Sequence, residues 1–522
     1  MNSTLSEAKK ELNRRDVVKL GGGALLASAV STLSVPSFAA SFEASELQYM
    51  TASELLPLFR SRKVSPVEVL KAQIAQYEAV NDKVNCVTYT HFDTAMVAAK
   101  ASEQRYMKGT ARALEGITCA AKDEHHDAGW IVTQGSSILK ANVMEHADPI
   151  VTRLKAAGAV LPIQTTVPEF YLNGVTWSKL WGVTRNPWNL KYAVGGSSGG
   201  SGASLAAGMA TMATGSDMGG SVRIPAHFNG LYGFKPPTGR VPTGAVASYF
   251  LGTGPLARGF EDMTMLQNVM AGPDSSSPAT MPKLEMPLVY PDIKGMRIAY
   301  VPTMGLVPLD DDTKTAMDSA VEKLRSLGAK VDIIEFDPGF KGDEVGEIFS
   351  KGGLGGPIGG GLAGFADRTD EMTPYASALV KKAASGKYNA GTVVEFEAYV
   401  VEFYKRLSAA VFDKGYEALV APTVATPHVP ADYDLSIGGL VVQGQELHPF
   451  SILGLTAPWN FLNWSPVIDA PAGISSQGVP IGMQIIGKSY EDMKVFQIAY
   501  AYAALAPKMF TGNLMPDYRN PA

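Results

Sequence analysis

Two glycine-rich segments that each carry serine could together perform acyl-transfer chemistry. The first spans residues 195–200 and reads Gly-Gly-Ser-Ser-Gly-Gly, and the second is Gly219-Gly220-Ser221. Glycines at this density favour left-handed backbone or the close approach of bare N–H groups to a ligand. A serine hydroxyl among such donors has the makings of a nucleophile beside an oxyanion hole, the set of N–H groups that stabilises a developing negative oxygen.

A serine nucleophile needs a base, and Lys122 is the candidate. A serine hydroxyl attacks weakly until a neighbouring group takes its proton. Lysine takes a proton only when it is neutral, so burial must lower its pKa from about 10.4. Lys122 directly follows the apolar run 117–121, which is consistent with such burial. Taken alone, a Lys-Asp pair after a strand is more typical of a surface or salt-bridged lysine.

The order and spacing of these residues carry more information than any one of them. Lys122 comes first, and Ser221 follows Ser197 by 24 residues (221 minus 197). In this arrangement the chain resembles the amidase signature family of amide hydrolases, from about residue 50 to residue 505. One glycine-rich loop alone would be a weak signal. The segments that carry the resemblance are 122–123, 168–170, 181–187, 195–200, 215–225, 233–236 and 478–484.

This resemblance implies a Ser-Ser-Lys triad that works through an acyl-enzyme. Ser221 would be the nucleophile, Ser197 the bridging serine on a cis peptide bond, and Lys122 the base. Ser197 would accept the proton of Ser221 while giving its own to Lys122, and the reverse flow would protonate the leaving amine. The expected oxyanion-hole donors are the backbone N–H groups of Met218, Gly219, Gly220 and Ser221.

Three further residues are expected to support the triad without acting on the substrate. Ser198 is expected to orient Lys122 through a structural hydrogen bond. Asp217 and Arg223 lie on either side of Ser221 in the sequence, and we expect them to brace its loop as an ion pair or as capping groups.

The residues after Lys122-Asp123 depart from the family pattern, which usually includes an asparagine there. This chain has Glu124-His125-His126, which adds charge and bulk near the active site, so a relative's substrate preference cannot be transferred. The two histidines invite a Ser-His-Asp or metal interpretation. Adjacent residues point to different sides of a helix or strand, so we expect neither shared ligation nor catalysis, and a role in lining the pocket stays open.

The elements that must position these residues alternate between strands and helices. Capping-box sequences at 51–54 and 65–68 predict two helix starts. The alternation predicts an α/β fold with one large domain, whose mixed, mainly parallel sheet is covered by helices on both faces. The expected strands are 85–90, 116–121, 160–164, 296–301, 330–334, 418–421, 467–470 and 483–486, and the other expected helices are 94–107, 150–157, 201–212, 312–327 and 492–505. The apolar, glycine-rich segment 352–366 has no periodicity and is expected to form a mobile loop or pocket rim, or else a surface loop.

Residues 1–39 have the features of an export signal. Basic residues, ending with the paired arginines 14–15, precede an apolar, small-residue run at 20–35, and small residues lead up to Ala39. Paired arginines are typical of the twin-arginine route. We expect cleavage after Ala39, an amidase domain over 40–522, and a periplasmic or secreted protein without stable membrane insertion. An uncleaved membrane anchor is the alternative, but the apolar run is shorter than the roughly 18 residues a span needs.

Composition limits the partners of the chain. Of its 522 residues, 46% are hydrophobic and 18% are charged, as in ordinary soluble enzymes. A net charge of −5 argues against non-specific nucleic-acid binding. Cys86 and Cys119 could pair in an oxidising compartment, but both lie in strand-like runs, and we expect buried free thiols. No set of histidine, cysteine and carboxylate residues has zinc spacing, so neither a metal nor another cofactor is expected.

We therefore expect a serine amidase that hydrolyses the C–N bond of a small-molecule carboxamide. One alternative is the glutamine-hydrolysing subunit of a tRNA-dependent amidotransferase, which an export signal and an acidic chain oppose. The other is a non-enzymatic periplasmic solute-binding protein, which would leave Lys122 and both serines without a role. The sequence identifies neither the acyl nor the amine part of the substrate, and it leaves the oligomeric state open.

Overall fold

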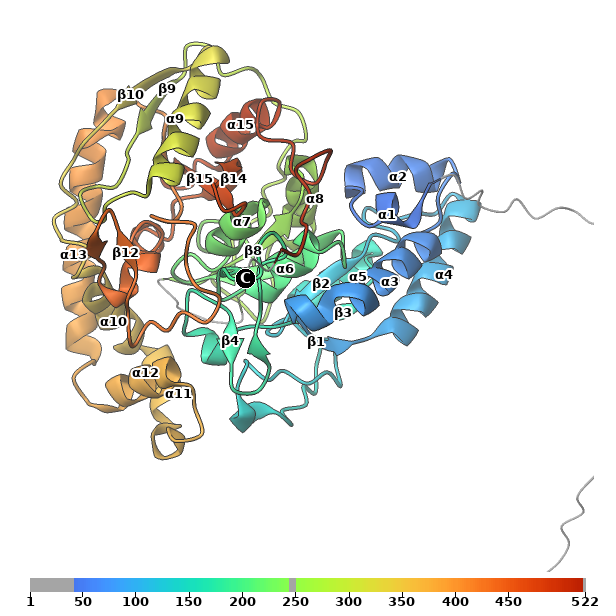
Figure 1. Cartoon of the computed structure of the whole chain (residues 1–522), viewed down its shortest axis with the longest axis horizontal. Coiled ribbons are helices and arrows are strands. Elements are labelled where there is room, and N and C mark those ends of the chain that lie inside the picture. The colour runs from blue at the N-terminus through green and yellow to red at the C-terminus, as the bar shows by residue number, and fades with distance from the viewer. Residues whose placement is uncertain (1–41, 244–249, 520–522) are drawn as a thin grey trace, which may run out of the picture. The chain divides into compact units, whose positions relative to one another are not determined.

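A computed structural model describes residues 42–243 and 250–519, and the expected export signal at 1–39 lies outside these residues. An 11-stranded sheet runs through the described chain in the order β1-β3-β2-β6-β8-β7-β14-β15-β11-β9-β10 (Figure 1). Its strands are β1 Val87–Thr90, β2 Cys119–Lys122, β3 Ile163–Thr165, β6 Met212–Asp217, β7 Tyr232–Lys235, β8 Gly252–Ala257, β9 Arg297–Tyr300, β10 Lys330–Ile333, β11 Ala418–Pro422, β14 Val467–Ile474 and β15 Pro480–Gly487. Two small hairpins pair β4 Trp177–Ser178 with β5 Gly182–Val183 and β12 Val441–Val442 with β13 Gln445–Glu446.

The helices of the described chain follow the expected starts closely. Both capping boxes form: the side chains of Thr51 and Glu54 cap α2, and those of Ser65 and Glu68 cap α3. The helices are α1 Ala44–Leu47, α2 Ala52–Arg60, α3 Pro66–Val84, α4 Phe92–Lys108, α5 Pro149–Ala157, α6 Gly199–Ala206, α7 Arg223–Asn229, α8 Phe260–Met270, α9 Asp311–Ser326, α10 Val345–Leu354, α11 Pro357–Ala363, α12 Pro374–Ala384, α13 Ala390–Ala410, α14 Pro458–Phe461 and α15 Asp492–Ala503.

Alternate residues of β11 point into two different hydrophobic cores. Leu419 and Ala421 belong to a core that includes residues of α10 and α13. Ala418 and Val420 belong to a core that includes residues of α9 and α15. Because successive side chains of a strand point to opposite faces, these cores lie on opposite sides of the sheet. The α/β class and the cover of helices on both faces are confirmed.

The balance of strand directions differs from the expectation. The sheet is mixed, but among its described strands only four pairings are parallel, β2 with β3 and β6, and β9 with β10 and β11. The six others are antiparallel and include the whole central run from β6 to β11. The cause is visible at β14 and β15, which a short turn containing Gly478 joins without a helix. Strands joined by such a turn must run antiparallel.

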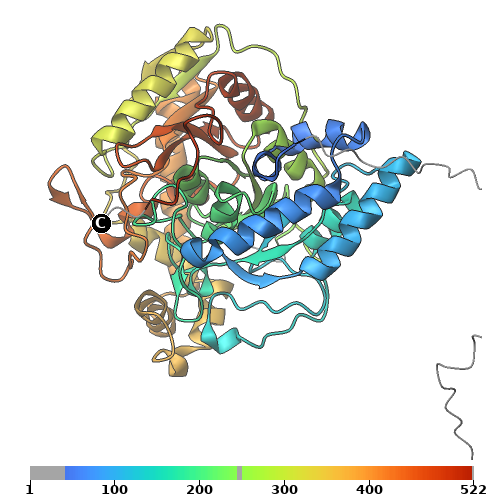
Figure 2. The ribbon, with the colours of Figure 1, turned by 45° about the vertical axis from the view of Figure 1, so that its right-hand side comes forward.

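The helices divide between the two ends of the sheet. Helices α3, α4 and α5 gather beside β1, β2 and β3, and α9 lies beside β9 and β10 (Figure 1). The same neighbours stay together when the view is turned by 45° (Figure 2). Helices α6 and α7, which follow the two serine segments, lie between these ends, so the serines are held at the middle of the sheet.

The helix expected at 201–212 is shorter and starts earlier. Helix α6 spans Gly199–Ala206, and the chain then turns at Gly208, which has a φ of 73°, and enters β6 at Met212. Alanine-rich sequence favours continuing the helix, but the left-handed glycine ends it and β6 is buried in the sheet. Similarly, the strand expected at 160–164 is β3 at Ile163–Thr165.

The glycine-rich segment 352–366 is not a loop. It contains the end of α10 and all of α11, and a short 3-10 turn, Ala366–Arg368, begins at its end. Glycine has low helix propensity, so the composition concealed these helices. Tertiary packing explains them: a side chain at Gly352 would collide with the rings of Phe250 and Phe396. The alternative of a pocket rim is correct in position, because these helices border the cavity described below.

Both cysteines, Cys86 and Cys119, are buried free thiols, as expected. Within residues 42–243 and 250–519, every helix is too short or too polar to cross a membrane.

Candidate active site

Lys122 lies at the end of β2 and contacts the expected bridging serine. Its side chain is fully buried, and its Nζ donates to Ser197 Oγ at 2.9 Å and to Ser216 Oγ at 2.7 Å. β2 and β6 are parallel neighbours, so their carboxyl ends meet at the same edge of the sheet. Lys122 and Ser216 therefore lie side by side there. The Gly196–Ser197 peptide bond is cis, as the family resemblance implied.

Ser221 follows β6 and faces the same space as Ser197. The two serines and Ser216 line one cavity, and Ser221 retains 9% of its exposure. The backbone N–H of Ser198 donates to the carbonyl of Ser221 at 3.3 Å, which joins the two glycine-rich segments. The structure thus brings Lys122 and Ser197 into direct contact and places Ser197 and Ser221 in the lining of one cavity.

The surroundings of Lys122 favour its neutral form in part. Burial lowers the pKa of Lys122, while the carboxylate of Glu124, with Oε2 at 3.3 Å from Nζ, acts in the opposite direction. The net direction is downward. The ring of Tyr171 covers the ammonium with its centroid 5.0 Å from Nζ, and Tyr171 donates its hydroxyl to the carbonyl of Asp123. A lysine in this position loses its proton more readily than one in water.

The predicted oxyanion-hole donors divide into two groups. The Gly220 N–H donates to Asp217 Oδ1 at 2.8 Å, so this donor already has an acceptor within the protein. The N–H groups of Met218, Gly219 and Ser221 have no acceptor among residues 42–243 and 250–519. Gly220 has a φ of 128°, and an added Cβ would collide with Thr456. Both effects require glycine at this position.

Asp217 and Arg223 form the brace that was expected beneath the Ser221 loop. The guanidinium donates through Nε to Asp217 Oδ2 and through Nη2 to Oδ1, each at 2.9 Å, and both side chains are fully buried. Burial alone would raise the pKa of Asp217, but Arg223 holds it well below its usual range. The carboxylate also accepts the N–H of Val222 at 3.1 Å and the Nδ2 of Asn460 at 2.9 Å. One carboxylate thus holds the loop on both sides of Ser221.

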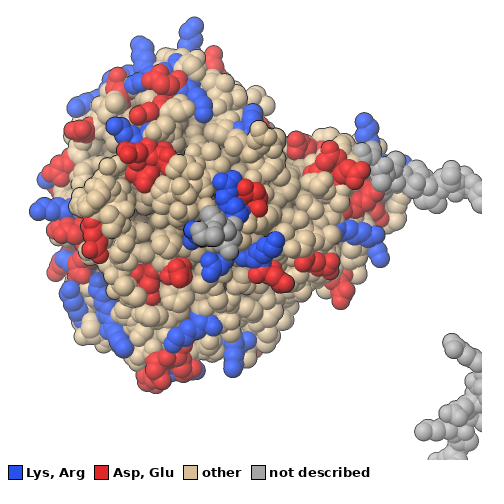
Figure 3. All heavy atoms as spheres, viewed as in Figure 1, with Lys and Arg blue, Asp and Glu red and all other residues tan. Residues whose placement is uncertain are grey.

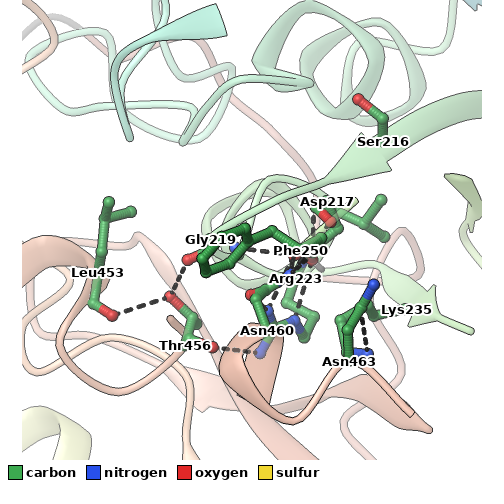
Figure 4. A network of polar contacts seen from close by, with 12 residues as sticks. Ser216, Asp217, Gly219, Arg223, Lys235, Phe250, Leu453, Thr456, Asn460 and Asn463 are labelled. Atoms are coloured by element: carbon green, nitrogen blue, oxygen red, sulfur yellow. Dashed lines mark hydrogen bonds and ion pairs between the residues drawn. The ribbon is translucent and has the colours of Figure 1, made fainter. Parts of the chain in front are cut away.

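A distant chain segment that contains Thr456 and Asn460 holds this ion pair and the Ser221 loop in place (Figure 4). Arg223 donates to the carbonyl of Thr456, to Gln484 Oε1 and to Asn460 Oδ1, at 3.0, 2.6 and 2.6 Å. The hydroxyl of Thr456 donates to the carbonyl of Gly219 at 2.6 Å. Nothing in the sequence marked Thr456 or Asn460, because they lie in a stretch without a readable motif.

Ser198 supports the site one step further away than expected. Its Oγ donates to the carbonyl of Ser216 and accepts the N–H of Ser216, both at 3.3 Å. It therefore positions Ser216, which in turn contacts Lys122. The structural hydrogen bonds expected of Ser198 thus reach Lys122 through Ser216. The sequence analysis gave Ser216 no role of its own and therefore missed its contact with Lys122.

The two histidines do not line the cavity. His125 is buried, and its Nδ1 pairs with Thr214 Oγ1 at 2.8 Å; the same hydroxyl accepts the backbone N–H of Lys122. His126 Nδ1 contacts the carbonyl of Glu124 at 2.9 Å. Their contacts are those of residues that fix the backbone around Lys122, and the pocket-lining role left open by the sequence is not found.

One cluster of the described residues has the donor types of a metal site, and it lies apart from the cavity lining. His428 faces two carboxylates, with Nδ1 at 3.3 Å from Asp310 Oδ2 and Nε2 at 3.5 Å from Asp312 Oδ2. A metal ion binds through one ring nitrogen. His428 Nδ1 contacts Asp310 Oδ2 within hydrogen-bonding distance, while Nε2 has no hydrogen-bond partner among the described residues.

The cavity in front of Ser221 has a volume of about 410 Å³ and apolar walls. Helix α10, helix α11 and the turns at 169–171 and 449–453 supply most of these walls. Glu124 is the one charged residue among the lining side chains that the structure describes. The aromatic side chains of the wall are Phe170, Tyr171, Phe349, Phe365 and Phe450.

Known proteins share this fold and sequence over most of their length. The family described as Amidase matches residues 68–342 and 363–496. An acylamidase from Rhodococcus erythropolis is 30% identical over 477 residues, which are 88% of this chain and 96% of the relative. A glutamyl-tRNA(Gln) amidotransferase subunit from Geobacter metallireducens is 31% identical over 481 residues, with 88% and 97% covered.

Solved structures of amide hydrolases are also similar to this chain. A bacterial aryl acylamidase of the amidase signature family is similar with a TM-score of 0.79 and 26% identity, covering 89% of this chain and 97% of that one. A 6-aminohexanoate cyclic dimer hydrolase is similar with a TM-score of 0.76 and 27% identity, covering 88% and 97%. The interval between the two matched family segments contains α10 and most of α11. These two helices of the cavity wall therefore lie almost wholly outside the segments that match the family.

Proposed function

The chain belongs to the amidase signature family of amide hydrolases, and from this premise we propose that it cleaves a carboxamide through an acyl-enzyme formed at Ser221. The observation that carries the proposal is the 2.9 Å hydrogen bond from the buried Nζ of Lys122 to Ser197, at the cavity that Ser221 also faces. A buried amine in contact with a serine of this cavity supports the assignment of Lys122 as the base.

The proposed reaction passes a proton from Ser221 through Ser197 to Lys122 and then returns a proton to the leaving amine. Neutral Lys122 takes the hydroxyl proton of Ser197 as Ser197 takes that of Ser221, and Ser221 Oγ bonds to the substrate's carbonyl carbon. The N–H groups of Met218, Gly219 and Ser221 stabilise the resulting oxyanion. The proton then returns along the relay to the amine nitrogen as the C–N bond breaks. Water, activated by the same relay, releases the acid and restores Ser221.

The cavity walls support an amide with a large apolar or aromatic group. About 410 Å³ of space lined by phenylalanine and leucine side chains is of the size that holds a drug-sized molecule. Burial of such a group would stabilise the complex by roughly 25 cal/mol for each Å² removed from water. Small hydrophilic amides would leave this space filled with water, so we propose aryl or long aliphatic amides as substrates.

The first test is hydrolysis itself, measured as a function of pH. The protein is expected to release 4-nitroaniline from an apolar acyl 4-nitroanilide. Since only neutral Lys122 accepts a proton, kcat/KM should fall as the pH drops through the pKa of Lys122. Burial lowers the pKa of Lys122 from the usual lysine value of about 10.4. The fall in kcat/KM should therefore be centred at a pH below that value. A profile that stays flat from about pH 5 to about pH 9 would contradict a neutral-lysine base.

Similarity to the amidotransferase subunit supports glutamine hydrolysis as a second candidate. Glutamine carries an α-carboxylate, which needs a cationic partner. Among the described residues, the cavity lining includes none. On the face shown in Figure 3, basic and acidic side chains are interspersed, so this face has no broad positive region for RNA. Release of ammonia from free glutamine at a rate above that from apolar amides would favour this candidate instead.

We also propose that the chain is exported and cleaved after Ala39. Support comes from the basic start, the paired arginines 14–15 and the apolar run at 20–35. Protein recovered from the periplasm of a bacterial host should begin at Ala40 or Ser41 when its N-terminus is sequenced. A periplasmic chain that still begins at Met1 would exclude cleavage.

A further inference from the structure

Glu124 gives the cavity a single negative charge beside the reacting groups. Its Oε2 accepts from Ser216 Oγ at 2.6 Å and lies 3.3 Å from Lys122 Nζ. Its side chain retains 24% of its exposure and lines the cavity together with Ser197 and Ser221. The carboxylate therefore contacts the base on one side and the substrate space on the other.

The carboxylate has an unused acceptor. Oε2 carries both contacts just described, whereas Oε1 receives no hydrogen bond from residues 42–243 or 250–519. A carboxylate has about four acceptor sites. The rest of the cavity wall is largely apolar, so an unpaired negative charge here is costly, and water offers only partial relief.

Glu124 has even less positive charge around it during catalysis, because of the protonation state of Lys122. A protonated Lys122 would balance Glu124, but the proposed reaction begins with neutral Lys122. The other charged groups nearby are already engaged: Asp123 accepts from Thr133, and Arg223 is paired with Asp217. When Lys122 is ready to accept a proton, the remaining basic side chain close to Glu124 is His125, whose Nδ1 pairs with Thr214 Oγ1. A cation on the substrate would supply the missing charge.

We propose that Glu124 binds a protonated amine of the substrate, so that the enzyme prefers amides whose apolar or aromatic body carries an ammonium group near the scissile carbonyl. This inference rests on the proposed amidase function and narrows its substrate class. The ammonium group donates to Oε1 while the apolar body fills the cavity. Low polarity around the pair strengthens the attraction. Amides with a negative charge in the same position are repelled.

The test compares two amides that differ by one amine. Phenylalaninamide has an α-amine with a pKa of about 7.7–8.0 and is mostly protonated near pH 7, whereas 3-phenylpropanamide lacks the amine. For the wild type, kcat/KM should be higher for phenylalaninamide by about 10- to 100-fold, the value of a charge-assisted hydrogen bond. In E124Q this ratio should fall by about tenfold or more. Because the amine also changes the intrinsic reactivity of the carbonyl, the change in ratio is the measured quantity.

Asp127→Asn is the matched control for charge. Asp127 lies on the same loop, pairs with Lys155 at the surface and does not line the cavity. Its replacement removes one negative charge and should leave the substrate ratio unchanged. If E124Q lowers kcat/KM equally for both amides, Glu124 only positions Ser216 and Lys122, and the inference is overturned. A wild type that favours 3-phenylpropanamide would overturn it as well.

A second measurement needs neither turnover nor a variant. 2-Phenylethylamine and 2-phenylethanol should differ in how well they protect the wild-type protein from a fluorophosphonate that labels serine nucleophiles. The amine should protect at a concentration lower by about tenfold. Equal protection contradicts amine binding at Glu124. Failure of the proposed amidase function would look different, because neither amide would then be hydrolysed and no serine would be labelled.

Discussion

Replacing Ser221 by alanine should lower kcat for amide hydrolysis on the order of 10⁴- to 10⁶-fold while leaving the fold intact. The hydroxyl is the only group of this side chain that can bond to the substrate's carbonyl carbon. Alanine fits the space of serine, and no described side chain depends on the Ser221 hydroxyl for a hydrogen bond. The measurement is the initial rate with an apolar amide, together with labelling by a fluorophosphonate, located by mass spectrometry of the peptides.

Ser204→Ala is the matched control for this substitution. Ser204 is also buried, lies in α6 and donates to the carbonyl of Ser201 at 2.8 Å, away from the cavity lining. Its loss should leave kcat and labelling close to those of the wild type. Activity of Ser221→Ala above about 1% of wild type would rule out Ser221 as the nucleophile. Label found on Ser197 instead would exchange the two assigned roles.

Replacing Arg223 by methionine should lower the free energy of unfolding by about 3–5 kcal/mol. Asp217 would remain buried with its carboxylate opposite an apolar side chain, and the loss of one partner from a buried pair leaves an uncompensated charge. The Thr456 carbonyl and the side chains of Gln484 and Asn460 would each lose a donor. Equilibrium unfolding in urea, followed by circular dichroism, measures the difference.

An exposed ion pair provides the contrast for Arg223. Arg368 pairs with Glu371 three residues later, and both side chains are more than 40% exposed. Arg368→Met should therefore move the urea midpoint very little, since solvent already screens that pair. If Arg223→Met unfolds at the same midpoint as the wild type, the brace beneath Ser221 does not stabilise the fold in the way we describe.

The site could be predicted from sequence where its chemistry is local. Ser197, Ser221 and Lys122 stand in short motifs whose order is informative, and the apolar run before Lys122 correctly indicated burial. The contacts of Ser216 and Glu124 could not be foreseen in the same way. They depend on the parallel pairing of β2 and β6, which brings the residues at the two strand ends together.

The fold could be predicted where side-chain patterns are strong, and the prediction failed where glycine weakens these patterns. Capping boxes located α2 and α3, and amphipathic spacing located α9. Helices α10 and α11 escaped detection because their glycines remove both propensity and periodicity, and only packing against Phe250 and Phe396 accounts for them. The antiparallel centre of the sheet was missed because neither β7 nor β8 was expected to be a strand.

The brace beneath Ser221 has a consequence for the timing of activity during synthesis. Arg223 and Asn460 are 237 positions apart, and Thr456 holds the carbonyl of Gly219 across the same interval. A nascent chain that has emerged only as far as β9 already contains the lysine and both serines, but it lacks Thr456, Asn460 and Gln484, which anchor Arg223 and the carbonyl of Gly219. Such an unfinished polypeptide should be inert, and competence should arise only after the ribosome has delivered the last strands.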